Sequence, residues 1–423
     1  MTTSRGTPAP LQGPAASSRG AGGRGVLPLL GALSALGPLS MDLYLPALPT
    51  LEREFDAGQS ATQLTLTAVA LGLALGQLVV GPLSDRLGRR VPVLVGVGAY
   101  ALASLLCALS PDVWVLSGIR LLQGVAGAAG IVLARAVVRD RLEGAEAARA
   151  FAVLASIMGA APVLAPVAGA QLLRFTDWRG VFVALTGIGV VLFLATLWRM
   201  PETLPPERRV AGGFRTTARN ARRLLARRAF VGAVLAQGLG FGTLFTYISS
   251  SSFVLQSGQG LSAQQFGLVF AVNGIGIVLA GQVSRLLVRR LGSRTLLVTG
   301  LSVEVVGSAV LLVGAMAGAG LPLVLPMLFL VVSANGLVLP NATALAMADA
   351  ARMAGTASAL VGTAQFALPG LGAPLAGFGT PGTLLPMAAV MVGFAATGWL
   401  AAVVLTRERA PAGRDPGEVP AAA

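Results

Sequence analysis

The chain of 423 residues contains no histidine and no lysine, and its single cysteine is Cys107. Without histidine, histidine proton relays are excluded, so that carboxylates remain the candidate proton carriers. One cysteine permits no disulfide within the chain, and inside an apolar segment it is expected to be a packing residue. The sequence also lacks a nucleotide-binding loop, a metal-ligand cluster and an appended soluble domain. These absences argue against an enzyme, and no cofactor is expected.

Charged residues are scarce, at 11% of the chain, whereas 55% of the residues are hydrophobic and the mean hydropathy is +0.78. Such a composition is typical of a membrane protein, because about 20 consecutive apolar residues cross a bilayer as a helix. We therefore predict an all-α membrane protein. The twelve predicted spans are residues 26–47, 61–83, 91–110, 113–135, 149–172, 180–200, 228–252, 263–287, 294–317, 321–345, 354–378 and 381–405.

All 31 basic residues are arginine, and the net charge of +14 by itself suggests nucleic-acid binding. The distribution argues against that role, because 27 arginines fall on one side of the predicted topology and three on the other. Cytoplasmic loops of membrane proteins carry the excess of basic residues. We therefore expect both termini and the central loop in the cytoplasm, and no nucleic-acid partner. The frequent use of arginine, alanine and glycine, with no lysine, indicates a GC-rich bacterial genome.

The predicted spans fall into two groups of six. Residues 26–200 form the predicted N-terminal half and residues 228–405 the C-terminal half, with 201–227 as a cytoplasmic linker. Within the linker, residues 214–228 either form a short basic helix on the inner membrane surface or only connect the halves. The end segments 1–25 and 406–423 are predicted to be disordered cytoplasmic tails.

A charged turn occurs twice, at equivalent places in the two halves. The first copy is Gly81-Pro-Leu-Ser-Asp-Arg-Leu-Gly-Arg-Arg90, after the second predicted span. A degraded copy follows the eighth span, as Gly281-Gln-Val-Ser-Arg285 and Arg289-Arg-Leu-Gly-Ser-Arg294. Repeated six-span halves are typical of duplicated transporters, whose substrate site lies between the halves near the bilayer midplane.

Three ionisable residues lie inside predicted spans, where each costs roughly 2.5–3.5 kcal/mol on insertion scales. Asp42 and Arg120 are at similar depths, and as a pair they lower each other's cost of burial. Asp42 is thus a candidate to bind a proton or a cationic substrate, the alternative being a structural pair that only fixes helix packing. Glu304 has no evident cationic partner in the membrane, and it either lines the cavity or faces water.

Polar side chains inside the spans are further candidates for substrate contact. Such residues can line a cavity, or they can be interhelical hydrogen-bond partners worth about 0.6 kcal/mol each. The candidate substrate-binding residues are Tyr44, Gln123, Tyr247, Asn273, Asn341, Gln365 and Glu304, with Asn335 as a further polar residue of this kind.

The turn at 81–90 resembles the motif between spans two and three of the major facilitator superfamily. The resemblance implies a major facilitator fold of twelve transmembrane helices in two six-helix halves, in which this turn is a conformational latch. It implies that Asp85 meets the start of span eleven, where Gly355-Thr-Ala-Ser358 begins a helix, and that Arg89 pairs with Asp140. The implied latch residues are Gly81, Asp85, Arg86, Gly88, Arg89, Arg90 and Asp140. The alternative is a turn that only sets topology.

Other motifs resemble the bicyclomycin-resistance (Bcr/CflA) type of drug exporter within that superfamily. Arg120-Leu-Leu-Gln-Gly124 is similar to a span-four motif linked to proton coupling. Pro162, Pro166 and Gly169 resemble the span-five exporter motif, although Ala165 and Ala170 depart from its general form; Ala165 is similar to the Bcr/CflA version. Proline and glycine there favour a kinked, closely packed helix. Further marks are Asp42-Leu-Tyr-Leu-Pro-Ala-Leu-Pro49, Trp178-Arg179, Pro201-Glu-Thr-Leu-Pro205, Gln265-Phe-Gly-Leu268 and Leu339-Pro-Asn341.

The resemblance implies a proton-coupled antiporter that exports drugs or other small, mostly apolar compounds across the inner membrane by alternating access. Asp42 and Arg120 would couple the proton to the compound, and the carrier would work as a monomer in the lipid bilayer. Because fold does not settle direction, a proton-coupled importer of a small metabolite stays open.

Overall fold

The computed structural model describes residues 26–209, 213–348, 350, 353–377 and 382–406, and within these ranges the regular elements are all helices. The predicted tails, except Thr406, lie outside the described residues. The elements of the N-terminal half are α2 (Leu27–Asp42), η1 (Leu45–Ala47), α3 (Leu48–Phe55), α4 (Gly58–Leu87), α5 (Arg90–Ala108), α6 (Val113–Arg141), α7 (Gly144–Leu172) and α8 (Trp178–Arg199). Those that follow are η2 (Pro206–Arg208), α9 (Gly213–Leu225), α10 (Arg228–Ser252), η3 (Phe253–Gly258), α11 (Ala263–Met316), α12 (Leu321–Ala348), α13 (Ala354–Gly372), η5 (Ala373–Gly377) and α14 (Leu384–Leu405).

Helix α11 contains two membrane spans. Its 54 residues would extend about 80 Å as one straight helix, whereas the hydrocarbon core of a bilayer is about 30 Å thick. Gly292 interrupts it with φ 76° and ψ 154°, a conformation that glycine adopts at little cost. The described chain has eleven helices long and apolar enough to cross a membrane. With α11 counted twice, the predicted twelve spans are confirmed.

Span boundaries differ from the prediction where charge or proline interrupts the hydropathy pattern. The predicted first span, residues 26–47, is confirmed and extends to Phe55, but within it α2 ends at Asp42 and the chain continues through η1 into α3. Pro46 and Pro49 lack the N–H groups that a continuous helix would need. The second span was predicted to end at residue 83, but α4 continues to Leu87. Charged residues lower the local hydropathy and so end the predicted span, although the helix itself continues.

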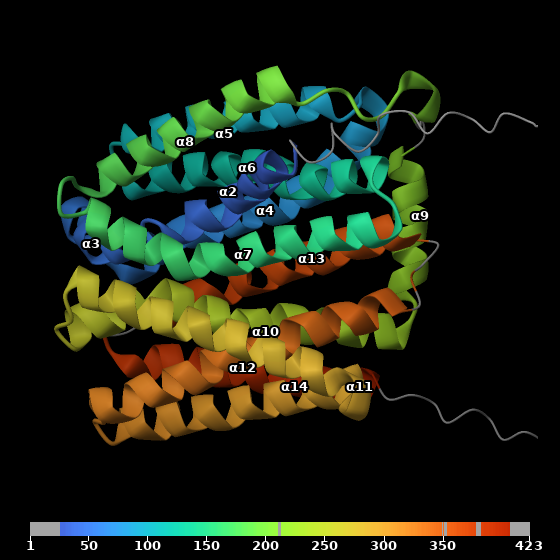
Figure 1. Cartoon of the computed structure of the whole chain (residues 1–423). Coiled ribbons are helices and arrows are strands. Elements are labelled where there is room, and N and C mark those ends of the chain that lie inside the picture. Colours follow the sequence, from blue (N-terminus) through green and yellow to red (C-terminus); the bar gives the residue numbers. More distant parts are fainter. Residues whose placement is uncertain (1–25, 210–212, 349, 351–352, 378–381, 407–423) are drawn as a thin grey trace, which may run out of the picture.

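The helices form two bundles lying side by side, α2–α8 in one and α10–α14 in the other (Figure 1). The bundles meet where α4 contacts α13 and α7 contacts α11. Helix α9 runs across one end of the bundles and contacts α4, α10 and α13, so that it spans both halves (Figure 1). We call this end, which carries α9 and the turn between α4 and α5, the basic end, and the end with η1, α3 and η3 the opposite end.

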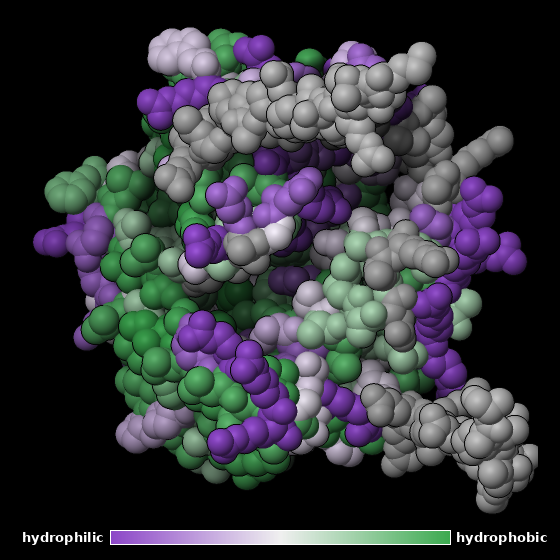
Figure 2. Space-filling view, turned by 45° about the vertical axis from the view of Figure 1, so that its right-hand side comes forward, coloured by the Kyte–Doolittle hydropathy of each residue, from purple (hydrophilic) through white to green (hydrophobic). Residues whose placement is uncertain are grey.

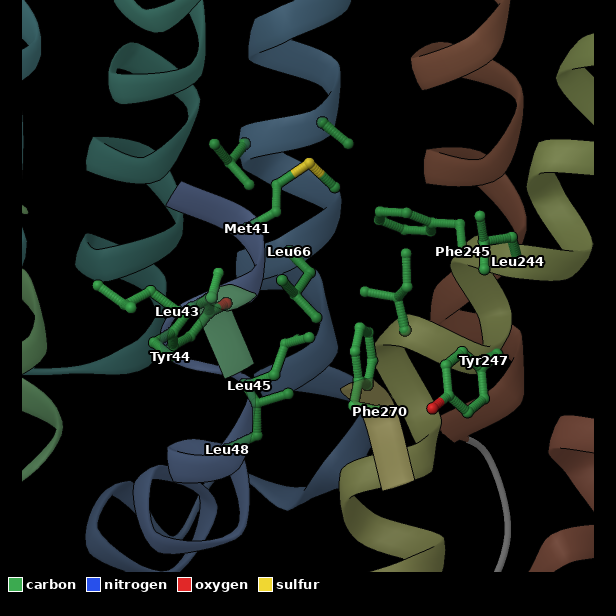
Figure 3. Close-up of a cluster of buried hydrophobic side chains, with 14 of the residues drawn as sticks. Met41, Leu43, Tyr44, Leu45, Leu48, Leu66, Leu244, Phe245, Tyr247 and Phe270 are labelled. Carbon is green, nitrogen blue, oxygen red and sulfur yellow. The ribbon is translucent and has the colours of Figure 1, made fainter. Parts of the chain in front are cut away.

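An apolar cluster joins the two halves toward the opposite end. Met41, Leu45 and Leu66 from the N-terminal half belong to the same buried cluster as Phe245 and Phe270 from the C-terminal half. In Figure 3 these side chains point toward one another across the space between the two bundles. Burying apolar surface in this way stabilises the contact between the halves.

Hydrogen bonds between uncharged groups close the same end. Gln63 Nε2 on α4 donates to the Ser249 carbonyl and the Ser250 hydroxyl on α10, at 3.2 and 3.1 Å. The other bonds between the halves at this end are Ser252 Oγ to Leu45 O at 2.8 Å, Gln256 Nε2 to Pro46 O at 3.2 Å, Gln264 Nε2 to Ala170 O at 3.2 Å and Gly382 N to Gln59 Oε1 at 3.0 Å.

Candidate functional site

Arg120 lies fully buried inside the N-terminal half, on α6. Its Nη1 donates to Gln123 Oε1 at 2.7 Å and its Nε to the Thr65 carbonyl at 3.4 Å. The guanidinium carbon stands 4.5 Å from the ring centre of Tyr44 and 5.4 Å from that of Phe182, and aromatic faces attract a cation at such distances. These contacts fix the cation in place, and Nη2 is left without an acceptor among the described residues.

Asp42, the last residue of α2, is 3% exposed and stands at the point where the first span breaks. It is close enough for an electrostatic interaction with Arg120. No ion pair within 4 Å and no hydrogen bond of its carboxylate occurs in the described part of the chain. The expected close pair is therefore not formed in this conformation. A buried carboxylate without a fixed partner is available to exchange a proton.

The predicted exporter motif supports this break from the neighbouring helix. Pro162, Pro166 and Gly169 all lie within α7. Gly169 packs directly on the backbone carbonyl of Leu43, so that a Cβ at residue 169 would collide with it. Close approach of α7 to the broken segment thus requires glycine at this position.

A cavity of about 460 Å³ opens at the basic end, between α4, α6 and α13. Figure 2 shows this end hollowed, with hydrophilic side chains around the opening. Its lining includes Gln77, Asp85, Arg135, Arg139, Asn220 and, from the start of α13, Ala354, Gly355, Thr356 and Ser358. The open basic end contrasts with the closed opposite end, and this combination is one of the two states that alternating access needs.

The turn at residue 88 is fastened by ion pairs. Arg89 Nε donates to Asp140 Oδ2 at 2.9 Å, which is the contact that the resemblance implied. Arg89 Nη1 donates to Asp85 Oδ1 at 2.6 Å. Asp85 and the start of α13 line the same cavity, and no hydrogen bond between them is present among the described residues. Gly81 and Arg86 lie on α4, with Arg86 exposed, and Arg90 Nη2 donates to the Leu197 carbonyl at 2.8 Å.

Glu202 caps the helix that follows this turn, a role that the sequence analysis missed. Its Oε1 accepts the backbone N–H of Arg89 at 2.8 Å, and its Oε2 accepts that of Arg90 at 3.3 Å. It also accepts the N–H groups of Thr203 and Leu204. Burial opposes the negative charge, but the four N–H groups outweigh it and hold the pKa of Glu202 below its usual 4.5. Because Arg89 and Glu202 are 113 residues apart, spacing could not have revealed the contact.

Apart from Glu304, the predicted substrate residues make separate hydrogen bonds within the two halves, and none of them is among the lining residues of the cavity. Near the opposite end, Asn273 Nδ2 donates to Tyr247 Oη at 2.8 Å. Asn341 Nδ2 donates to Ser284 Oγ and to the Leu337 carbonyl, at 2.7 Å each. Gln365 Oε1 accepts Gln237 Nε2 at 3.1 Å. Within the N-terminal half, Tyr44 Oη and Thr65 Oγ1 are 2.5 Å apart, and Gln123 Nε2 donates to Ser104 Oγ at 2.7 Å.

Arg135 is the cavity residue that the sequence could have indicated. The fourth span was predicted to end at residue 135, which made this arginine a loop charge, whereas α6 continues for six more residues to Arg141. Its Nη2 contacts the Met158 sulfur at 3.7 Å, and Arg135 also lines the cavity. A helical pattern continued through the charges would have placed it inside the span.

Comparison with known proteins agrees with this architecture. Residues 30–374 match the family description Major Facilitator Superfamily. The chain belongs to this superfamily. The fold and family are those of transporters, and the chain is a multi-pass membrane protein. Its helices also superpose on a bacterial homologue of the human lysosomal transporter Spinster, in an inward-facing structure, with a TM-score of 0.69 at 17% identity, over 90% of this chain and 95% of that one. A D-xylose–proton symporter gives a TM-score of 0.69 at 15% identity, over 91% and 96%.

Several bacterial members of the superfamily are similar in sequence. An uncharacterized transporter of this type from Bacillus subtilis, YdgK, is 38% identical over 90% of this chain and 95% of its own length. A bicyclomycin resistance protein homolog from Haemophilus influenzae is 30% identical over 80% and 85%. A chloramphenicol resistance protein from Pseudomonas aeruginosa is 34% identical over 67% of each chain. The resemblance to the bicyclomycin-resistance type is thereby confirmed.

Proposed function

We propose that this transporter is a proton-coupled antiporter that exports small, mostly apolar compounds across the bacterial inner membrane. Two relatives that are named for drug resistance match this chain over most of their own length, and this similarity supports export of drug-like compounds. The excess of arginine at the basic end supports a cytoplasmic position for that end. In this orientation the cavity takes up its compound from the cytoplasm or the inner leaflet.

The observation that carries proton coupling is the position of Asp42. Its carboxylate is buried beside, but not paired with, the fixed cation of Arg120. An ionised carboxylate there gains from Arg120, and a protonated one avoids the cost of burying a charge. The two states therefore lie close enough in free energy for the carboxylate to alternate between them.

Alternating access would couple this proton to the transported compound. With the basic end open, the compound enters and Asp42 releases its proton to the cytoplasm. The halves then rock about the α4–α13 and α7–α11 contacts, and the Gln63 contacts at the opposite end open. Protonation of Asp42 from outside would discharge the compound and reset the carrier. A gradient of protons thus replaces any cofactor as the source of energy.

The test is drug export by a pump-deficient bacterial host that expresses the wild type, Asp42→Asn or the control Asp177→Asn. Asp177 caps α8 within the N-terminal half, distant in sequence from the Asp42 region, and asparagine keeps its capping oxygen. We expect the wild type and Asp177→Asn to confer resistance to bicyclomycin, chloramphenicol-type or cationic compounds, and Asp42→Asn to confer none at equal membrane levels.

Proteoliposomes separate this proposal from import. Wild-type protein should release protons when compound is added, and Asp42→Asn should not. Intact coupling in Asp42→Asn would overturn the role of this residue. Proton-driven accumulation of a labelled metabolite, without resistance to any compound, would overturn export and support a proton-coupled importer.

A further inference from the structure

A second carboxylate lies buried in the C-terminal half. Glu304, in the second span of α11, is 0% exposed, and neither of its carboxylate oxygens has a hydrogen-bond partner among the described residues. It is not among the residues that line the cavity at the basic end. A fully buried polar group in a native protein normally has its partners, so two unpaired oxygens on one carboxylate require an explanation.

Polar side chains around Glu304 also lack hydrogen-bond partners among the described residues. The Thr243 hydroxyl of α10 lies beside the Glu304 carboxylate but does not form a hydrogen bond of normal geometry with it. Ser308 is one helical turn further along α11, and its hydroxyl is also unpaired. Asn335 of α12 is fully buried with both amide atoms unpaired.

Helix packing places these groups around one point. A Cβ on Gly240 of α10 would be 3.7 Å from Glu304 Oε2, so this part of α10 lies beside the carboxylate, and the same Cβ would collide with Val338 of α12. On α12, Val338 packs on Gly300 and Val331 packs on Gly307 of α11. Asn335 lies between those two contacts on α12, just as Glu304 lies between them on α11. Three helices therefore bring one carboxylate, two hydroxyls and one amide together.

Among the residues that the structure describes, no charged side chain near this cluster could stabilise Glu304 as an ion. Helices α12 and α14 contain no charged residue, and α10 has only Arg228, at its first position, with Tyr247 as its other titratable side chain. Tyr247 is bonded to Asn273. Arg294, on the same span as Glu304, donates to the Thr406 and Val403 carbonyls. Burying an unpaired carboxylate costs far more than burying its neutral form, so a proton is the partner that the site lacks.

We propose that Glu304, with Thr243 and Asn335, is a second proton-binding site of the carrier. The carboxylic acid would donate to the Asn335 amide oxygen, and Thr243 would accept or pass on the proton when the halves rock. Each half would then hold one exchangeable proton, on Asp42 and on Glu304. That the second proton takes part in transport rests on the proposed antiport, whereas its binding to Glu304 does not.

Infrared difference spectra between acid and alkaline pH, on purified protein in lipid nanodiscs, test the binding directly. A carboxylic acid absorbs at a frequency that its carboxylate form lacks. We expect one such pH-dependent band to disappear in Glu304→Gln and to remain in the control Glu146→Gln, whose residue is exposed on α7. A wild-type spectrum identical to that of Glu304→Gln, or a band that stays unchanged at every pH, would overturn the site.

Thr243→Val keeps Glu304 and provides the test if Glu304→Gln does not fold. Valine has nearly the shape of threonine but no hydroxyl, so the carboxylic acid band should shift in frequency. A purely structural role of Thr243 would leave the band in place, and that result would contradict the cluster.

Proton release on addition of compound then tests the role in transport. We expect Glu304→Gln to release fewer protons per bound compound than the wild type, because the Glu304 proton, whose release follows that of Asp42, is missing. If the infrared band is lost in Glu304→Gln but neither the wild type nor this variant releases protons, Glu304 is a proton-binding site and the proposed antiport is wrong. If release is equal in both proteins, Glu304 has no part in coupling.

Discussion

The Glu202 carboxylate accepts the backbone N–H of Arg89 at 2.8 Å, and thereby ties the segment after α8 to the start of α5. The first backbone N–H groups of a helix have no partner within the helix, and an anion there is favoured by the helix dipole. The same Arg89 reaches Asp140 at the end of α6 through its side chain. Three helices of the N-terminal half are thus joined at one turn.

Glu202→Gln should destabilise the protein at neutral pH and have less effect in acid. Because the pKa of Glu202 is below its usual 4.5 in the folded protein, its stabilisation is present above about pH 5 and is lost as pH falls through the lowered pKa. Its side chain is 30% exposed, so we expect about 1 kcal/mol at pH 7 after solvent screening. Thermal unfolding of both proteins in detergent between pH 3 and 8 measures the difference, and a difference that grows in acid would contradict the cap.

Gly88→Ala should destabilise the protein more than Gly144→Ala. Both glycines have positive φ, 93° and 53°, and Gly88 combines it with ψ 176°, a region that is essentially restricted to glycine, so the backbone alone makes alanine more costly at residue 88. A Cβ at residue 88 would also collide with the Glu202 carboxylate, whereas one at residue 144 meets nothing within 4 Å. Unfolding temperatures of the two variants measure the excess cost. Equal decreases in the unfolding temperature would show that the Glu202 side chain moves aside without a measurable cost.

Arg120→Lys should abolish transport while the protein stays folded. Lysine keeps the positive charge but lacks the planar fork that bonds Gln123 and Thr65 and lies over the Tyr44 ring. We expect at least tenfold lower export activity at equal membrane levels. The control Arg179→Lys changes an arginine that pairs with Glu54 near the surface of the opposite end. Wild-type activity in Arg120→Lys would show that charge alone is sufficient.

Gln63→Leu should shift the carrier toward a state open at the opposite end. The change removes two hydrogen bonds between the halves, worth about 0.5–1.5 kcal/mol each, from one of the two states. In a Cys107→Ser background, Leu255→Cys places the only thiol at this buried end. Because both bonds are lost, about 1–3 kcal/mol together, thiol labelling of residue 255 from outside should then become about five- to 150-fold more extensive.

Gln171→Leu is the matched control for this labelling. Gln171 is exposed and bonds only Arg174 in its own half among the described residues. Equal labelling in Gln63→Leu and Gln171→Leu would show that Gln63 does not hold the opposite end closed.

The span count and the buried charges were predictable because hydropathy and charge inside an apolar run are local properties. The twelve spans, the burial of Asp42 and Arg120, and the position of the charged turn all follow from such runs. The break at the end of α2 was missed, since hydropathy continues through it and only Pro46 and Pro49 mark it. Proline after an apolar run does not distinguish the end of a span from a break inside it.

The positions of individual polar residues were not predictable for a different reason. Helices α12 and α14 are apolar on nearly every side, so periodicity cannot show which face meets the cavity. Gln77 and Gln365 have the same chemistry, yet one lines the cavity and the other bonds Gln237. Only the packing of helices distant in sequence separates them.

The bonds that close the opposite end between the halves join amides, hydroxyls and carbonyls. Among the described residues no ion pair joins the halves there, and the Arg179–Glu54 pair of that end lies within the N-terminal half. The charged contacts lie within the N-terminal half, and those of Arg89 are at the basic end. Dissolved salt screens charges but scarcely changes hydrogen bonds between neutral groups. In the proposed orientation, the contacts that close the exterior face therefore change little between dilute and saline surroundings, which suits a face that meets an environment the cell does not control.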